Sequence, residues 1–171
     1  WAGYIGIFII IFAECGVLLG IFLPGDSLLF TAGFLASQGH LNIALLILIC
    51  FVGAVLGDNF GYAFGRRAGP AIFKKEDSFF FHKKHLERAA RFYDAHGGKT
   101  VILARFMPII RTFAPILAGV GRMNYKVFIL YNLVGGALWA IGLTSLGYFL
   151  GATIPGVDKY LFPIVLMIII L

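Results

Sequence analysis

Residues 22–33, "FLPGDSLLFTAG", interrupt a predominantly apolar stretch that runs from Trp1 to Ala36. Pro24 removes a backbone hydrogen-bond donor, and Gly25 lowers the helix propensity at the same place. Asp26 adds a carboxylate, which costs free energy in hydrocarbon unless it is paired or hydrated. A break and a charge at one place predict that this stretch is the tip of a bent segment and not the middle of a continuous helix.

The composition is that of an integral membrane protein. The chain has 171 residues, of which 60% are hydrophobic and 13% charged, and its mean hydropathy is +0.94. A soluble domain carries roughly 25% charged residues. Strands of a membrane barrel would alternate apolar and polar residues, whereas the apolar runs here are continuous. We therefore expect an all-α membrane protein that forms a single domain over residues 1–171.

Two segments are long and apolar enough to cross a bilayer, which takes roughly 20 residues. The longest uncharged run covers 31 residues, 127–157, and predicts a span over 127–151. A second span is expected over 41–65, interrupted only by Asp58, and residues 160–171 begin a further one. The protein is thus predicted to be multi-pass.

The linker between these spans, residues 66–99, is the most polar part of the chain. It holds nine of the 14 lysines and arginines and has a net charge of +5, so the positive-inside rule predicts that it is cytoplasmic. Within it, "HKKHLERAARFYDAHGG" (82–98) has the pattern of an amphipathic helix with a Gly-Gly C-cap. Two interpretations stay open, a helix at the lipid surface and a soluble connector.

Two short matches indicate an internal repeat. The pair "AG" at 32–33 recurs at 118–119, and "GYAFG" at 61–65 recurs as "GYFLG" at 147–151, both at an offset of 86 residues. Each repeat would consist of a broken apolar segment followed by a span. The second broken segment, "RFMPIIRTFAPILAG" (105–119), has its predicted breaks at Pro108 and Pro115, as the first has at Pro24 and Gly25.

The arms of the broken segments are too short to cross the membrane. An arm of about 10 residues spans roughly half of a hydrocarbon core about 30 Å thick. We therefore predict re-entrant hairpins over about 4–37 and 100–120, so that each repeat (1–65 and 100–151) crosses once and the second is inverted. Inverted repeats with broken helices are typical of transporters. Because the apolar run before Pro24 is long, full crossing of the first segment, with parallel repeats, stays open.

Five ionisable residues fall in apolar surroundings: Glu14, Asp26, Asp58, Arg105 and Arg111. The repeat offset places Asp26 within one residue of Arg111, so two facing tips would bring acids against arginines. Guanidinium groups bind phosphate, while carboxylates would neutralise the site and carry protons. The alternative is a set of ion pairs that only hold the packing. Asp58 is either part of this group or a charge at the interfacial end of its helix.

Other residues carry no separate chemistry. The glycines at positions 53, 57, 61 and 65 and at 135, 142, 147 and 151 predict close helix packing. Cys15 and Cys50 are expected to be buried small residues, and the histidines form no metal-binding pattern. We expect no metal, no cofactor and no nucleic-acid partner.

Three blocks of the sequence resemble a known family. "PGDSLLFTAG" (24–33), "GDNFGYAFGRRAG" (57–69) and "ARFMPIIRTFAPILAGVGRMNYKVFILYNLVGGALW" (104–139) are similar to the signature blocks of the DedA family of bacterial inner-membrane proteins, part of the VTT-domain or SNARE-associated superfamily. The resemblance implies facing re-entrant hairpins and the translocation of lipids between leaflets, with dependence on the proton motive force. It implies that Glu14 and Asp26 are the essential acids and that Arg105 and Arg111 are the essential arginines.

We therefore expect a flippase for a phosphate-bearing lipid in the bacterial inner membrane, with undecaprenyl phosphate as the leading candidate. Arg105, Arg111, Glu14 and Asp26 would form the substrate site, and the two acids would handle protons. Alternatives are a phosphatidylethanolamine or other phospholipid flippase or scramblase, a proton-coupled exporter of small solutes, and a structural membrane protein. A lipid phosphatase would need a histidine nucleophile within the membrane, so we expect no enzyme. The oligomeric state stays open.

Overall fold

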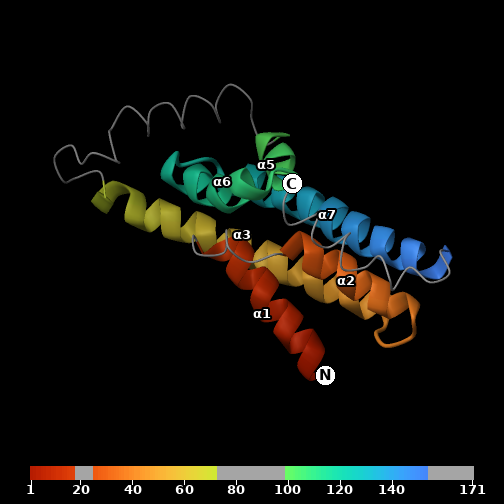
Figure 1. The fold of residues 1–171 in the computed structure, drawn as a ribbon. Helices are drawn as coiled ribbons and strands as arrows, with labels where there is room; N and C mark the ends of the chain where they lie inside the picture. The colour runs from red at the N-terminus through yellow and green to blue at the C-terminus, as the bar shows by residue number, and fades with distance from the viewer. Residues whose placement is uncertain (18–24, 73–98, 154–171) are drawn as a thin grey trace.

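The computed structural model describes residues 1–17, 25–72 and 99–153. Every element in these ranges is a helix: α1 (Ala2–Gly16), α2 (Gly25–Ser37), α3 (Ile43–Ile72), α5 (Lys99–Arg105), α6 (Pro108–Val120) and α7 (Tyr125–Thr153) (Figure 1). The predicted all-α class is confirmed for the described residues. The predicted break at Pro24, the amphipathic segment 82–98 and the start of a last span at 160–171 lie outside them.

Two helices are long and apolar enough to cross a membrane. In α3 the apolar stretch Ile43–Ala68 has 26 residues and contains an 18-residue window with a mean hydropathy of 2.3, and α7 has 29 residues and contains such a window with a mean hydropathy of 1.7. At 1.5 Å per residue, 26 helical residues are about 39 Å long, more than the hydrocarbon core. The bounds of α7 agree with the predicted span 127–151, whereas α3 continues past residue 65 to Ile72 and includes Arg66 and Arg67.

The two sides of α3 differ in a way that suits a helix between protein and lipid. One side exposes large apolar side chains at every fourth position: Leu48, Val52, Leu56, Phe60 and Phe64. The other side carries the glycines at 53, 57, 61 and 65, each of which lies close to atoms of α1 or α6. Small residues let helix backbones approach closely, so the predicted packing role of these four glycines is confirmed.

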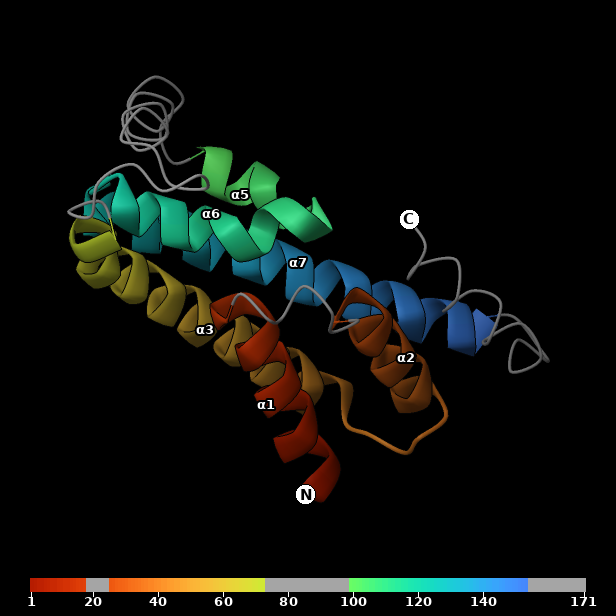
Figure 2. The same ribbon diagram turned by 60° about the vertical axis from the view of Figure 1, so that its left-hand side comes forward.

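α3 and α7 run antiparallel. The amide nitrogen of Asn132, in the first part of α7, donates a hydrogen bond of 3.2 Å to the carbonyl oxygen of Val55. Further along α3, the ring of Tyr62 stacks on Phe128 with the centroids 4.5 Å apart, and its hydroxyl donates to the carbonyl oxygen of Met123 at 2.6 Å. Late residues of α3 therefore contact the start of α7, as Figures 1 and 2 also show.

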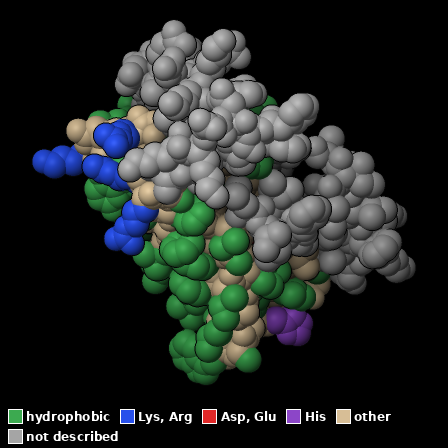
Figure 3. Space-filling view, turned by 90° about the vertical axis from the view of Figure 1, so that its left-hand side faces the viewer, with side chains coloured by type: hydrophobic (Ala, Val, Ile, Leu, Met, Phe, Trp, Pro, Cys, Tyr) green, Lys and Arg blue, Asp and Glu red, His purple; other side chains and the backbone are tan. Residues whose placement is uncertain are grey.

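One end of the helix pair is basic. The last turns of α3 and the residues around the start of α7 carry exposed cations, namely Arg66, Arg67, Arg122 and Lys126. Figure 3 shows Lys and Arg side chains gathered at one end of the visible face, a histidine near the other end, and apolar side chains between them. We call the region of these four cations the basic end.

α1 begins at the end opposite to the basic end and runs alongside α3. The hydroxyl of Tyr4 accepts a hydrogen bond of 2.7 Å from the backbone nitrogen of Asn42, just before α3 begins. Further along, a Cβ atom at Gly57 would lie 2.7 Å from the carbonyl oxygen of Phe12. α1 therefore runs parallel to α3 and ends beside the middle of that helix.

α2 runs back to the end where α1 began. It packs against α7 in the opposite direction: a Cβ atom at Gly33 would overlap the carbonyl group of Thr144, and one at Gly147 would overlap the carbonyl group of Phe30. Figure 1 shows α2 alongside the second half of α7. The start of α1 and the end of α2 thus lie at the same end of the molecule.

The other pair of short helices, α5 and α6, lies on the basic side. α6 packs against the last turns of α3, where a Cβ atom at Gly65 would overlap the carbonyl group of Ile116 and one at Gly119 would overlap that of Tyr62. α5 begins beside the same cluster, in which Val101 packs with Tyr62. This pair therefore begins and ends at the basic end, and its break points toward the middle of the molecule.

Of the breaks predicted in the second segment, one is found and one is not. Pro108 is at the start of α6, where its missing N–H is not needed by the helix. Pro115 lies inside α6, which continues to Val120, so the prediction of a break there is wrong. Proline is tolerated inside membrane helices where neighbouring helices hold the backbone, and buried Pro115 packs against α3 at Gly61.

The helix crossings of the two halves correspond to each other. Gly33 of α2 and Gly119 of α6 occupy equivalent places, as the repeated Ala-Gly pair predicts. Gly147 of α7, in contrast, corresponds to Gly65 of α3 and not to Gly61, so the match of "GYAFG" with "GYFLG" is displaced by one helical turn. A Cβ atom at Gly142 would have no described atom within 4 Å, so the predicted packing role of this glycine is wrong.

Candidate functional site

The first part of the site is a three-residue ion cluster around Arg111, in the first turns of α6. Its guanidinium donates to Oε1 of Glu14 on α1 and, at 2.5 Å, to Oδ1 of Asp26 on α2. The side chains of Arg111, Glu14 and Asp26 are 5%, 3% and 24% exposed. The predicted pairing of Asp26 with Arg111 is confirmed, and one guanidinium joins two carboxylates from different helices.

Gly25 makes this cluster sterically possible. A Cβ atom at residue 25 would overlap Oε2 of Glu14, so any other side chain there would displace the carboxylate. Gly25 is also the first residue of α2. The glycine predicted as a helix break therefore has a second role, because it leaves room for the acid that pairs with Arg111.

The second part of the site surrounds Arg105, the last residue of α5. Its guanidinium pairs with Asp58 on α3 and donates to Oδ1 of Asn132 on α7 at 2.5 Å. The side chains of Arg105 and Asp58 are 3% and 7% exposed. The expectation that the acids of the first break would face both arginines therefore holds for Arg111 only. The interpretation of Asp58 as an interfacial charge is wrong, since it is buried in the middle of α3.

Trp139, on α7, lies between the two clusters. The Cζ atom of Arg111 is 4.8 Å from the centre of the indole ring, and that of Arg105 is 6.0 Å away. The indole N–H donates a hydrogen bond of 2.7 Å to Oδ1 of Asp26. The sequence-based expectations place neither Trp139 nor Asn132 at the site. Both lie in the longest uncharged run. They are seven residues apart and therefore share one helix face, which is the sequence pattern that could have indicated a common site.

The charges and hydrogen bonds of the site are not balanced. Three carboxylates face two guanidiniums, so with all five groups ionised the site carries one excess negative charge. Among the described buried atoms, Glu14 Oε2, Arg105 Nη1 and Arg111 Nε have no hydrogen-bond partner. Buried polar atoms without partners are uncommon in folded proteins, and a bound water, an ion or a functional role is the usual explanation for one.

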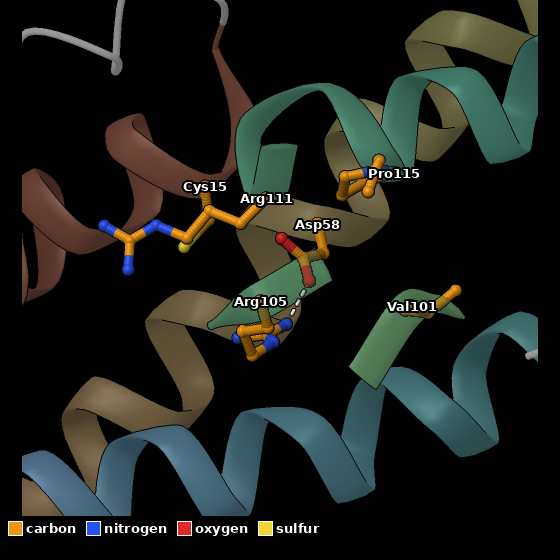
Figure 4. A pocket seen from close by; sticks show the side chains of 7 residues that line it. Cys15, Asp58, Val101, Arg105, Arg111 and Pro115 are labelled. Atoms are coloured by element: carbon orange, nitrogen blue, oxygen red, sulfur yellow. Dashed lines mark hydrogen bonds and ion pairs between the residues drawn. The ribbon is translucent and has the colours of Figure 1, made fainter. Parts of the chain in front are cut away.

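A small cavity touches both arginines. It is also lined by Cys15, Asp58 and Pro115, and Figure 4 shows Arg105 and Arg111 coming to it from separate helices. Its space corresponds to about one water molecule, which is less than a phosphate group needs. A phosphate would therefore enter this site only if side chains or helices moved apart.

A helical membrane fold with buried, paired charges at the meeting point of two broken segments defines a class of protein, and the VTT domain family matches residues 23–149. The chain belongs to the DedA family of VTT-domain membrane proteins. It is 44% identical to Protein DedA of Escherichia coli (strain K12), over 98% of this chain and 77% of that protein. It is 48% identical to an uncharacterized membrane protein of Mycobacterium leprae (strain TN), over 94% of this chain and 72% of that protein.

A third relative is the Inner membrane protein YqjA of Escherichia coli (strain K12), 34% identical over 96% of this chain and 79% of that protein. No solved structure matches the chain significantly. The comparisons thus agree with the membrane class and the family inferred from the sequence blocks.

Proposed function

We propose that the protein is a transporter that moves a phosphate-bearing lipid across the bacterial inner membrane, with undecaprenyl phosphate as the leading candidate. One observation carries this proposal: two buried guanidiniums each keep an unpartnered donor nitrogen beside an excess of carboxylate. Ionisable residues among membrane helices are costly and are generally kept for a function. Membership of the DedA family supports the same assignment.

Arg111 is suited to exchange a carboxylate for a phosphate. The planar guanidinium fork binds carboxylate and phosphate groups in the same geometry, so a lipid phosphate would take the place of the carboxylates of Glu14 and Asp26. The lipid tail would stay in the bilayer, next to exposed apolar side chains such as Leu103, Phe106 and Met107 around the break between α5 and α6. Arg105 would contribute its free Nη1 while Asp58 and Asn132 hold it.

Protons would control this exchange. A single proton removes the excess negative charge of the site, and Glu14 Oε2, which is buried and without a partner, is the oxygen best placed to carry it. Protonated Glu14 would bind Arg111 more weakly, because the ion pair becomes a neutral hydrogen bond. The arginine would then be available to the lipid phosphate.

The arrangement of the helices supports a topology for transport. We propose that α1–α2 and α5–α6 are re-entrant hairpins that enter from opposite sides and meet at the site. Because α3 and α7 are antiparallel counterparts, the two halves would form an inverted repeat, as in many transporters. The basic end would face the cytoplasm by the positive-inside rule.

The test is translocation of labelled undecaprenyl phosphate in proteoliposomes with an imposed proton gradient. Wild type should move the lipid, Arg111→Gln should not, and Glu14→Gln should lose the dependence on the gradient. Lys126→Gln, which removes an exposed cation outside the site, serves as the matched control. An undiminished rate in folded Arg111→Gln would refute the proposal. Equal movement of phosphatidylethanolamine would favour a phospholipid flippase or scramblase instead.

A further inference from the structure

Trp139 is the one aromatic side chain that contacts both arginine clusters in the described part of the chain. We propose that Trp139 is a positioning residue: its indole face keeps the guanidinium of Arg111 in the site while a lipid phosphate replaces the carboxylates of Glu14 and Asp26. The inference rests on the proposed function, because it concerns the same phosphate site. It assigns a role to a residue that carries no charge.

The position of the indole does not depend on Arg111. Trp139 is 2% exposed and belongs to the apolar cluster that includes Ile11, Leu29 and Ala140. Its N–H is bonded to Asp26 on a different helix from Arg111. Packing on one side and this hydrogen bond on the other hold the ring, so its face remains a fixed surface when Arg111 changes partners.

The two arginines depend on this surface to different degrees. Arg105 lies at the 6.0 Å limit of a cation–π contact and is held independently by Asp58 and Asn132. Arg111 lies closer, at 4.8 Å, and its ion-pair partners among the described residues are the two carboxylates that the proposed mechanism releases. Trp139 is therefore the contact that Arg111 retains during the exchange. A preplaced guanidinium binds phosphate more tightly, since less order has to be imposed on binding.

Trp139 can also report on its own surroundings. The chain has two tryptophans, and Trp1 is 89% exposed, so Trp1→Phe leaves Trp139 as the single emitter. Undecaprenyl phosphate added to this variant in detergent should change the Trp139 emission in a saturable way. Undecaprenol, which has the same tail without phosphate, should not. Inorganic phosphate is added in a separate titration. A change in Trp139 emission with inorganic phosphate indicates that the phosphate group alone is sufficient, and no change indicates that the lipid tail is also needed.

Substitutions separate the ring face from the N–H. With radiolabelled undecaprenyl phosphate, Trp139→Phe should bind within about threefold of wild type, because the aromatic face remains. Trp139→Leu should bind at least about tenfold more weakly, which corresponds to loss of a desolvated cation–π contact. Phe128→Leu removes a buried ring of α7 in another cluster and should leave binding unchanged. Wild-type affinity in folded Trp139→Leu would overturn the inference.

A double-mutant cycle tests the contact without any lipid. Unfolding of Trp139→Leu, Arg111→Met and the double variant should be non-additive by about fivefold or more in the unfolding equilibrium constant. Additive effects would refute the contact itself. If wild type binds neither undecaprenyl phosphate nor inorganic phosphate, the proposed function is refuted. The role of Trp139 in placing Arg111 for a phosphate is then refuted as well, whereas the contact between the two side chains is tested by the cycle alone.

Discussion

Removal of the Arg111 guanidinium alone should destabilise the protein more than removal of Arg111 together with the Glu14 charge. The side chains of Glu14 and Asp26 are 3% and 24% exposed in the structure. In Arg111→Met both carboxylates lose the cation that they pair with. Breaking a buried ion pair by removing one partner costs about 3–5 kcal/mol. For a chain of this size that loss corresponds to a fall in Tm of roughly 6–20 °C.

Neutralising Glu14 as well, which returns the site to the net charge of wild type, should recover much of this loss. In Arg111→Met/Glu14→Gln the deeply buried acid is neutral, and Asp26 keeps the hydrogen bond from Trp139. Thermal unfolding of purified protein in detergent measures all three forms, with Lys126→Met as the exposed-cation control, expected within about 0.5 kcal/mol of wild type. If Arg111→Met unfolds at the wild-type temperature, the carboxylates do not depend on Arg111 and the ion cluster around it is refuted.

Three further predictions concern the rest of the fold and site. Asp58→Asn should lower the free energy of unfolding by about 3–5 kcal/mol, because it leaves the buried Arg105 cation without its ion-pair partner. Asp58→Asn/Arg105→Met should lower it by less, and equal losses in thermal unfolding would contradict this. Gly65→Ala should cost about 1–3 kcal/mol because its Cβ overlaps a backbone carbonyl, whereas Gly142→Ala should not destabilise, and chemical denaturation compares the two. Gly25→Ala should displace the Glu14 carboxylate and impair transport in proteoliposomes more than stability; an unimpaired rate would be contrary to that role.

The pairing of Asp26 with Arg111 can be predicted from the sequence because both residues lie beside helix breaks that the repeat aligns. A break places a charge at the end of a short helix, and the repeat indicates which other break it faces. The continuous apolar runs predict the helical class, and the long uncharged run predicts a span, 127–151, that lies within α7. The sequence also places Arg105 in the interior, but with the wrong partner.

The depth of Asp58 cannot be predicted without knowing where its helix ends. The sequence suggests an end at the first arginine, two turns beyond Asp58, which leaves that depth undecided. α3 continues to Ile72, so Asp58 lies near the middle of the helix and reaches Arg105. Arg66 and Arg67 do not end α3, because their long side chains can reach polar surroundings while the backbone stays helical.

Trp139 and Asn132 cannot be assigned from the sequence because the relation between α3 and α7 depends on tertiary packing. The sequence match of the two spans is one turn away from their structural correspondence, and one turn changes which residues face the site. Only the glycine–carbonyl contacts at the helix crossings reveal the true register. The sequence offset that aligns the two broken segments therefore does not align the two spans.

The measurement that tests the phosphate assignment most directly is the identification of lipids that co-purify with the protein. Wild type and the Arg111→Met/Glu14→Gln variant, whose site has the same net charge as wild type, would be extracted from the same membranes and their lipids compared by mass spectrometry. We expect one phosphate-bearing lipid, undecaprenyl phosphate first among candidates, to be enriched with wild type and lost from the variant, while bulk phospholipids stay equal. Identical lipids in both preparations would contradict the assignment of Arg111 to the lipid phosphate.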